Sequence, residues 1–229
     1  MLSIQHVTAG YGRTRIVDDV SVELAAGEVV ALLGRNGMGK TTLLRALFGL
    51  CDVFAGTLST EHGALPLGKP DGLARSGLSF MPDDRGVFPS LTVGENLRLA
   101  RRRGSTPPVD VLEVFPVLAQ RLTQPAGQLS GGQKQQLGLA RAMLAGDCAI
   151  VVDEFSQGLQ PNIATAALQA LRAIAATGVT VLLVEQGPQL PLAYADRILG
   201  MVKGRLVFDE SVQRLRSDPE PLTSLLVVG

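Results

Sequence analysis

The chain has 229 residues, enough for one α/β domain with an inserted lobe but too few for two separate domains. Its 21 Lys and Arg residues balance its 21 Asp and Glu residues, so no whole-chain field attracts nucleic acid or an anionic membrane. Hydrophobic residues make up 46% of the chain and aromatic residues only 4%, which predicts a core of Val, Leu, Ile and Ala around a buried parallel sheet.

Cysteine usage and the N-terminus indicate the compartment. Cys51 and Cys148 lie far apart, in a spacing that suits neither a metal site nor a redox pair, which predicts a reducing, cytoplasmic setting. Residues 1–13 lack a basic segment followed by an apolar core, so no secretory signal is expected. Apolar runs such as 179–184 fall far short of the ~20 residues that span a bilayer. Any contact with a membrane is therefore expected through a partner.

The first fifty residues predict strands followed by one helix. Apolar and polar side chains alternate over 2–6 and over 20–24, as in short strands. Residues 28–33 (EVVALL) form an almost continuous apolar run, typical of a buried strand. A Gly-rich turn follows, and then a helix from about residue 40 to 48 that Gly49 can end.

The rest of the chain alternates helices and strands. Residues 85–146 are mostly helical in pattern but broken by prolines, which predicts a smaller helical lobe. Two apolar strands, 149–152 and 179–184, flank a helix at about 163–176, and a hairpin is expected over 198–208. The tail after residue 217 is expected to be dispensable. This alternation predicts a three-layer α/β core.

Residues 34–41 (GRNGMGKT) match the phosphate-loop pattern, between a predicted strand and a predicted helix. The glycines let backbone N–H groups face an anion, and the start of the helix adds its positive dipole end. Lys40 supplies a cation for the outer phosphates, and the Thr41 hydroxyl can ligate Mg²⁺. A chance match in such a chain has a probability on the order of one in a hundred. The residues expected to bind nucleotide here are Gly34, Asn36, Gly37, Gly39, Lys40, Thr41 and Thr42.

The strand at 149–152 ends in two acids, Asp153 and Glu154. Ligands of an open α/β sheet bind at the carboxyl ends of its strands, so these acids are expected beside the phosphate loop. Asp153 can hold Mg²⁺, and Glu154 can accept a proton from the water that attacks the γ-phosphate. Alone, a strand that ends in Asp-Glu often just reaches solvent; together with the phosphate loop, the catalytic interpretation is favoured.

Residues 129–133 (LSGGQ) precede a predicted helix over 134–144 and lie about twenty residues before Asp153. This string, followed by a helix and then by an apolar strand ending in Asp-Glu, resembles the signature of ABC-type ATPases. The resemblance implies that this tip contacts the γ-phosphate of ATP held by a second subunit, in a head-to-tail dimer. A plain Gly-rich helix cap is the alternative for the tip alone. The residues expected to bind phosphate in this way are Ser130, Gly131, Gly132 and Gln133.

The resemblance extends over nearly the whole chain. It implies one ABC ATPase domain over 1–229: a P-loop, RecA-like α/β core with an antiparallel β subdomain and a helical subdomain inserted at about 85–146. Tyr11 matches the family's adenine-stacking aromatic, a contact worth roughly 1–3 kcal/mol; an ordinary hairpin tyrosine is the alternative. Residues 156–159 match the loop that contacts the opposite subunit, and 88–97 match the segment after the family's hinge loop.

Three positions depart from the common ABC pattern. Residues 81–85 (MPDDR) match the family's hinge loop, and Asp83 stands where that loop offers Gln or Glu to the metal and the attacking water; it is expected to act through water. Gln186 replaces the usual switch His after the last core strand; it can donate to a γ-phosphate oxygen but cannot carry its proton. Phe155 stands where most members have Pro. Hydrolysis is then expected to depend on Glu154, Mg²⁺ and Ser130.

The string 182–186 (LLVEQ), with ADR and KGR beyond it, resembles the second ATPase of branched-chain amino-acid importers, a branch that includes urea and amide importers. We therefore expect the ATP-hydrolysing subunit of such an importer, peripheral on the inner face of the cell membrane. Its expected partners are permease subunits, an identical or sister ATPase and, indirectly, a substrate-binding protein, with no nucleic acid. The alternative is a low-turnover, nucleotide-gated regulatory subunit. An ABC ATPase of DNA repair or translation ranks last, since no fused second half or basic tail is present.

Overall fold

The fold contains two β-sheets, seen in a computed structural model that describes residues 1–102, 104 and 107–227. A four-stranded antiparallel sheet has the order β2-β1-β4-β5, and a six-stranded sheet has the order β10-β9-β3-β8-β7-β6. In the larger sheet every neighbouring pair is parallel except β9 and β10. The strands are β1 (Leu2–Tyr11), β2 (Thr14–Leu24), β3 (Val29–Leu33), β4 (Asp52–Thr60), β5 (Gly63–Leu65), β6 (Leu78–Met81), β7 (Ala149–Val152), β8 (Thr180–Glu185), β9 (Arg197–Val202) and β10 (Arg205–Ser211).

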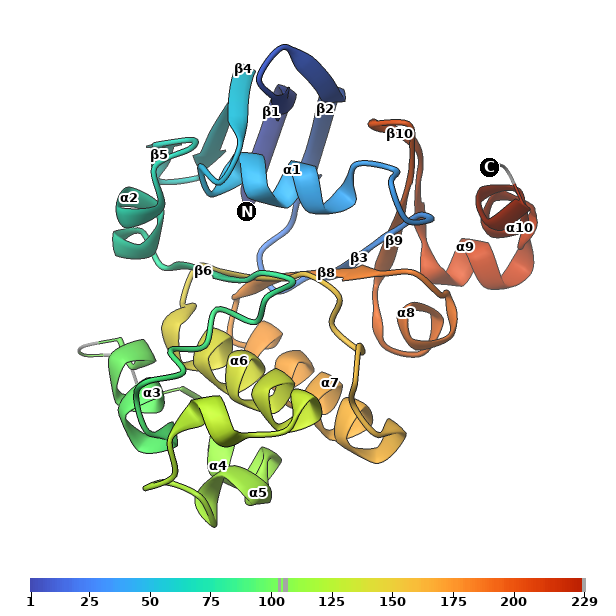
Figure 1. Ribbon diagram of the computed structural model, residues 1–229. Coiled ribbons are helices and arrows are strands. Elements are labelled where there is room, and N and C mark those ends of the chain that lie inside the picture. Colours follow the sequence, from blue (N-terminus) through green and yellow to red (C-terminus); the bar gives the residue numbers. More distant parts are fainter. Residues whose placement is uncertain (103, 105–106, 228–229) are drawn as a thin grey trace.

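Helices cover both faces of the larger sheet (Figure 1). They are α1 (Lys40–Leu47), α2 (Pro70–Arg75), α3 (Val93–Ala100), α4 (Val111–Val114), α5 (Pro116–Ala119), α6 (Gly131–Ala145), α7 (Pro161–Ala175), α8 (Gln189–Tyr194), α9 (Val212–Ser217) and α10 (Glu220–Val227), with a 3-10 turn over Ala126–Gln128. Helix α1 lies between the two sheets, and α6 and α7 lie on the opposite face of the larger one (Figure 1). The expected three-layer α/β core is confirmed.

The sheet can be covered on both faces because its central strands are buried along their whole length and are apolar except at the two ends of β8. Every residue of β3 and of β8 is buried. Leu43, Leu44 and Leu47 of α1 pack on one side, in a cluster that also takes in side chains of the antiparallel sheet. On the other side, apolar residues of α6 and α7 form a second cluster. These contacts fix the carboxyl ends of β3, β7 and β8, from which the loops of the candidate site extend.

Helices α3 to α6 lie between β6 and β7, within the range 85–146 where a helical lobe is expected. Two of them begin with a capping box. Thr92 and Glu95 cap α3 reciprocally, and Ser130 and Gln133 do the same for α6. Such boxes satisfy the free N–H groups at a helix start and fix where each helix begins. The division of the chain into a core and a helical subdomain stays a prediction.

The first two strands are longer than the alternating pattern predicts. His6 and Asp19 have positive φ angles of 54° and 55°, and the pairing of β1 with β2 shifts register between Ile4 and Val7. The His6 Nδ1 atom lies 2.8 Å from Oδ1 of Asp19 across the two strands. A bulge breaks the period of two, so a search for alternation ends where the strand continues.

The C-terminal tail differs from expectation. Helix α10 (Glu220–Val227) follows Ser217, and Leu222 and Leu225 are buried in a cluster with side chains of β3 and β9. The expectation that this tail is dispensable is therefore wrong, because it completes an apolar core at the edge of the sheet.

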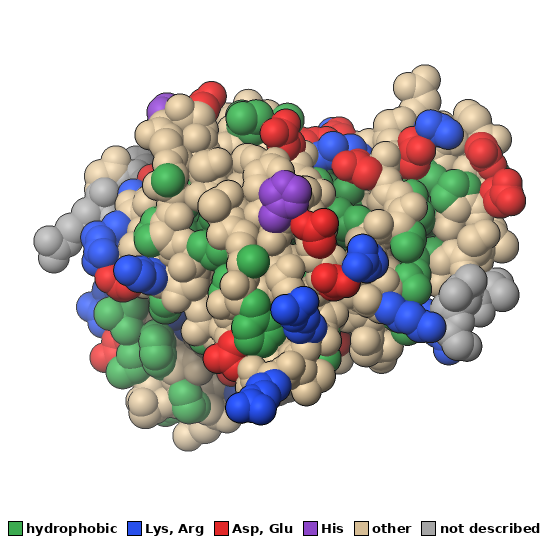
Figure 2. Space-filling model, turned by 90° about the horizontal axis from the view of Figure 1, so that it is seen from above, with side chains coloured by type: hydrophobic (Ala, Val, Ile, Leu, Met, Phe, Trp, Pro, Cys, Tyr) green, Lys and Arg blue, Asp and Glu red, His purple; other side chains and the backbone are tan. Residues whose placement is uncertain are grey.

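The described residues include no helix that is both long enough and apolar enough to cross a bilayer. Seen from above, Lys and Arg side chains are interspersed with Asp and Glu side chains on the visible face (Figure 2). This mixture agrees with the equal numbers of basic and acidic residues in the sequence.

Candidate functional site

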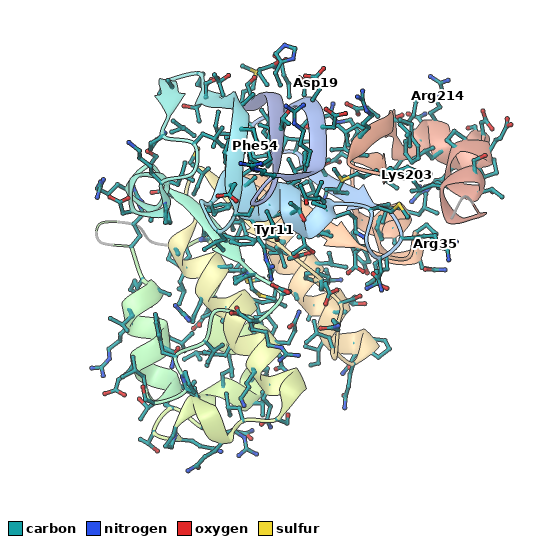
Figure 3. The ribbon with its side chains drawn as sticks, turned by 45° about the horizontal axis from the view of Figure 1, so that its top comes forward. Tyr11, Asp19, Arg35, Phe54, Lys203 and Arg214 are labelled. Atoms are coloured by element: carbon teal, nitrogen blue, oxygen red, sulfur yellow. The ribbon has the colours of Figure 1, made fainter. Side chains whose placement is uncertain are left out.

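The loop between β3 and α1 turns tightly where the phosphate-loop pattern places its glycines. Gly39 has a φ of 99° and caps α1 in a left-handed conformation that other residues rarely adopt. A Cβ atom on Gly34 would lie 2.5 Å from the carbonyl oxygen of Met201 in β9, so only glycine fits there. The β9–β10 turn also supports the loop, because the N–H of Gly204 donates to the Met38 carbonyl at 2.9 Å. Figure 3 shows Arg35, on this loop, next to the turn that carries Lys203.

Lys40 points back into this loop. Its Nζ atom donates to the carbonyl oxygens of Gly34, at 2.6 Å, and Arg35, at 3.0 Å. Burial lowers the pKa of Lys40, and the nearby carboxylates of Asp153, Glu154 and Glu185 offset part of that effect. An ammonium group held by neutral carbonyls at the start of a helix is a ready partner for an anion.

Asp153 follows β7 and is completely buried. Neither of its carboxylate oxygens has a hydrogen-bond partner in the part of the chain that the structure describes. Burial raises the pKa of Asp153, and the nearby Thr41 hydroxyl offsets that rise only in part. A buried carboxylate without a donor is costly unless a cation compensates it, so Asp153 and the Thr41 hydroxyl fit a hard cation such as Mg²⁺.

Glu154 has a φ of 47°, an uncommon conformation for a residue with a side chain. Its Oε1 atom accepts a hydrogen bond from Nε2 of Gln186 at 3.5 Å, the upper limit for such a contact. Two elements separated in sequence, the turn after β7 and the end of β8, therefore bring these side chains together. Gln186 lies within reach of the carboxylate that is expected to act as the base.

A cavity of about 620 Å³ opens between these groups. It is lined on one side by the phosphate loop and on the other by the ends of β7 and β8. The volume is within the range of small-molecule sites. Ten of the predicted nucleotide, metal or catalytic residues line it: Tyr11, Asn36, Gly37, Gly39, Lys40, Thr41, Thr42, Asp153, Glu154 and Gln186.

The signature tip lies apart from this cavity. Ser130 is exposed at the start of α6, and its Oγ atom accepts from the Gln133 N–H at 3.3 Å. None of Ser130, Gly131, Gly132 or Gln133 lines the cavity. A Cβ atom on Gly132 would lie 2.6 Å from the Gly158 carbonyl oxygen, so the tip packs against the loop that follows β7. This placement agrees with a contact made to another molecule, which stays a prediction.

Comparison with known proteins identifies the family. Residues 17–157, more than half of the chain, match the ABC transporter family. The chain is 36% identical to the high-affinity branched-chain amino acid transport ATP-binding protein BraG of Pseudomonas aeruginosa, over 96% of this chain and 97% of that protein. It is 32% identical to the probable branched-chain amino acid transport ATP-binding protein LivF of Archaeoglobus fulgidus, over 94% of each. The chain belongs to the ABC transporter family. It binds and hydrolyses ATP as that family's ATP-binding cassette.

Solved ABC cassettes share this fold. A structure described as the ATP binding subunit of an ABC transporter has a TM-score of 0.82 and 25% identity, and the match covers 100% of this chain and 95% of that one. A second cassette, solved as a dimer in a post-hydrolysis state with ADP and phosphate, has a TM-score of 0.79 at 22% identity, over 93% of this chain and 99% of that one. The expected ABC-type P-loop fold is thus confirmed.

Asp83 occupies a different environment from the one expected for this ABC ATPase. It does not line the cavity, and both of its oxygens accept from NH2 of Arg45 on α1, at 2.9 and 3.0 Å. NH1 of Arg45 lies 3.3 Å from the hydroxyl of Tyr11, and these bonds, that to Tyr11 first, raise the pKa of Arg45. Asp83 therefore faces α1 here, and its role at the metal stays a prediction.

Glu185 is a buried residue to which the sequence motifs assign no role. Its Oε1 atom accepts from the Ser156 N–H at 2.8 Å, and its Oε2 atom from the Ser156 hydroxyl at 3.0 Å. Burial raises the pKa of Glu185, and the two bonds from Ser156 oppose the rise. Glu185 joins the loop after β7 to the end of β8 beside Gln186. A carboxylate that ends an otherwise apolar strand was the available signal for it.

Proposed function

We propose that this ABC ATPase is the ATP-hydrolysing subunit of an importer for branched-chain amino acids or a related small polar solute. The observation that carries the proposal is the single cavity lined by the phosphate loop, Asp153, Glu154 and Gln186. Two relatives of nearly equal length, BraG and LivF, are described as branched-chain amino acid transport proteins, which supports the choice of solute.

Each group of residues around the cavity has a separate role in nucleotide binding and hydrolysis. Backbone N–H groups of the phosphate loop and the ammonium group of Lys40 bind the β- and γ-phosphates, and Tyr11 stacks on the base. Thr41 and Asp153 would hold Mg²⁺, and Asp83 would contribute through water once Arg45 releases it. A cation bound by these residues would neutralise charge on the phosphate oxygens.

Glu154 accepts a proton from a water molecule whose oxygen attacks the γ-phosphorus. The bond between that phosphorus and the β–γ bridging oxygen breaks, and ADP leaves with its electron pair. The Gln186 amide donates a hydrogen bond to a γ-phosphate oxygen but cannot transfer a proton to it.

The site is complete only with a second ATPase, either a copy of this chain or a sister subunit. In this arrangement Ser130, Gly131, Gly132 and Gln133 of one molecule contact the γ-phosphate bound by the other. The exposed position of Ser130, outside its own cavity, supports this contact in trans. Closure on ATP and reopening after hydrolysis would move the helical subdomain, residues 85–146, against a permease on the inner face of the membrane. A substrate-binding protein would be linked only through that permease.

A Glu154→Gln variant tests the catalytic assignment. Loss of a general base lowers turnover by about 10²–10⁴-fold, whereas ATP binding to the phosphate loop should persist. Mg-ATP turnover and nucleotide affinity of the purified chain are measured beside Glu113→Gln, a matched change at an exposed glutamate of α4. Equal rates for the wild type and Glu154→Gln would remove Glu154 as the base.

A low-turnover, nucleotide-gated regulatory subunit is the second candidate, favoured by the bond between Arg45 and Asp83. The two candidates differ in the wild-type rate when the chain is assembled with its permease in vesicles. An importer subunit hydrolyses ATP faster when the transported solute is present, and leucine and urea are the first solutes to compare. A regulatory subunit binds ATP and shows no such stimulation.

A further inference from the structure

Gln135 is a buried polar side chain on α6 that no motif accounts for. Its relative exposure is 2%, and it lies one turn beyond the signature tip. Its Nε2 atom donates to the carbonyl oxygens of Glu154, at 2.9 Å, and Phe155, at 3.0 Å. Its Oε1 atom accepts from Nε of Arg85 at 3.1 Å. The amide therefore uses both of its N–H groups on the turn that carries the catalytic carboxylate.

The groups on either side of this amide are conformationally unusual. Glu154 and Arg85 both have positive φ angles, 47° and 71°, which residues with side chains adopt only when their surroundings hold them there. Buried carbonyl groups at such a turn need donors. Gln135 supplies one donor to each of two successive carbonyls, so its position and that of the Glu154 backbone are linked.

Residues of α6 that follow Gln135 also pack against the hinge loop. A Cβ atom on Gly138 would lie 2.8 Å from the Arg85 carbonyl oxygen, so the loop packs directly on the helix backbone. Further along, Arg141 donates to the Gly86 carbonyl, and its guanidinium lies 4.6 Å from the ring centre of Phe88. The hinge loop and α6 thus form one packed unit, with Gln135 on the side that faces Glu154.

We propose that Gln135 is a positioning residue that couples the position of α6 and the hinge loop to the orientation of the Glu154 carboxylate. The coupling rests on the proposed role of Glu154 as the base. Ser130 caps the N-terminus of α6, so docking of this tip on a phosphate fixes the helix from one end, while the hinge loop fixes it along its length. Gln135 links the position of α6 to the backbone of Glu154 and Phe155 through two hydrogen bonds. The Glu154 carboxylate is therefore aligned only when α6 is in its docked position.

Gln135→Glu is the sharpest variant. It keeps the shape of the side chain and an acceptor for Arg85, but it places a carboxylate oxygen where the N–H donors meet the carbonyls of Glu154 and Phe155. Gln136→Glu is the matched control, because Gln136 is the next residue of α6 and its amide oxygen has no partner among the described residues. Gln135→Met removes both functions of the amide without adding charge.

Three measurements on the full chain separate positioning from a general structural role. A misplaced catalytic group costs on the order of 10- to 100-fold in rate, so kcat should fall by that factor in Gln135→Glu while KM for ATP changes less than about threefold. Amide hydrogen exchange should become faster in the peptide that covers residues 153–158. The effect on kcat should disappear in a Glu154→Gln background, because the group being positioned is absent there.

The outcomes are distinguishable from failure of the catalytic assignment. If Glu154→Gln abolishes turnover while Gln135→Glu keeps wild-type kcat and wild-type exchange at 153–158, the positioning role is wrong and the role of Glu154 stands. If Gln135→Glu and Gln135→Met lose ATP binding and folding together, Gln135 is structural only and the proposal is overturned. If Glu154→Gln keeps the wild-type rate, Glu154 is not the base. Faster exchange at 153–158 in Gln135→Glu would then show only that Gln135 holds the backbone of this turn through its hydrogen bonds.

Discussion

Arg45 binds both carboxylate oxygens of Asp83 through a single nitrogen, at 2.9 and 3.0 Å. The two residues come from α1 and from the loop after β6, and neither of them lines the cavity. Because Arg45 also contacts the Tyr11 hydroxyl, one guanidinium joins the side chain expected to stack on the base to the carboxylate expected at the metal. Asp83 must leave Arg45 before it can face a cation.

Removing Arg45 should therefore lower the Mg²⁺ concentration that ATP hydrolysis requires. The side chains of Arg45 and Asp83 are 34% and 37% exposed, and ion pairs near the surface contribute about 0.2–1 kcal/mol. Arg45→Met should lower the Mg²⁺ concentration for half-maximal turnover by up to about fivefold, and Asp83→Asn in the same chain should abolish the gain. Mg²⁺ titrations of ATPase rate check this. Arg75→Met, which breaks an exposed pair with Asp71, is the control. An unchanged Mg²⁺ dependence in Arg45→Met would show that Asp83 does not serve the metal.

The sequence predicts the centre of the site better than its surroundings. Glycines, Lys40 and Thr41 occur at fixed spacings in a strand-turn-helix unit, so local geometry alone brings them to one phosphate. Asp153 and Glu154 follow a buried strand, and the rule for parallel sheets places them at the same edge. All four of these named residues line the cavity.

Side-chain contacts between segments that are distant in the chain could not be predicted from the sequence. Arg45 and Asp83 are 38 residues apart, and nothing in either segment indicates that α1 and the hinge loop face each other. Gln135 and Glu185 likewise acquire partners only through the packing of α6 and the pairing of β7 with β8. The bulges at His6 and Asp19 break the alternating pattern, which hides the full length of the first two strands.

Asp153→Asn should stabilise the nucleotide-free protein. Neither oxygen of the buried Asp153 carboxylate has a hydrogen-bond partner among the described residues, and burial raises its pKa by more than the nearby Thr41 hydroxyl lowers it, so the charged form weakens the fold. Neutralising it should increase the free energy of unfolding at neutral pH by about 1–3 kcal/mol. Urea unfolding without nucleotide measures this, with Asp84→Asn at an exposed position as the control. The same variant should lose the extra stabilisation that Mg²⁺ adds to ATP. A less stable Asp153→Asn protein would contradict the account of this site.

Ser156→Ala should destabilise the fold in a pH-dependent way. The Ser156 hydroxyl donates to Glu185 at 3.0 Å and favours its ionised form, so its loss should cost about 1–3 kcal/mol where Glu185 is charged. Burial sets the folded pKa of Glu185 above the ordinary 4.5, so protonation begins at a higher pH in the folded state. The deficit of Ser156→Ala should therefore be largest above that folded pKa and shrink as the pH falls through it.

Urea unfolding of the wild type and Ser156→Ala over a pH series measures this deficit. Ser76→Ala, which removes an exposed hydroxyl bonded only to a backbone carbonyl, should show a small deficit that does not vary with pH. A deficit for Ser156→Ala that is equal at all pH values would mean that the hydroxyl does not discriminate between the two forms of Glu185.

Substitution of Ser130 should separate ATP binding from assembly. Ser130→Arg puts a long side chain at the tip that is expected to meet a second molecule's γ-phosphate, so ATP-dependent dimers should be lost while the isolated chain still binds ATP. Arginine is a poor helix cap, and losing the cap of α6 costs about 0.5–2 kcal/mol. Ser130→Asp removes this ambiguity, because aspartate caps a helix as well as serine but repels phosphate.

Both variants are compared in a Glu154→Gln background, where slow hydrolysis keeps ATP bound. Light scattering with Mg-ATP should show dimers for Glu154→Gln alone and monomers when either Ser130 substitution is added. Ser217→Arg, at an exposed position at the end of α9, should leave dimers intact. ATP affinity should stay within about threefold throughout, since the cavity is formed without Ser130. Loss of ATP binding together with dimers would place Ser130 in its own chain's site and contradict the contact in trans.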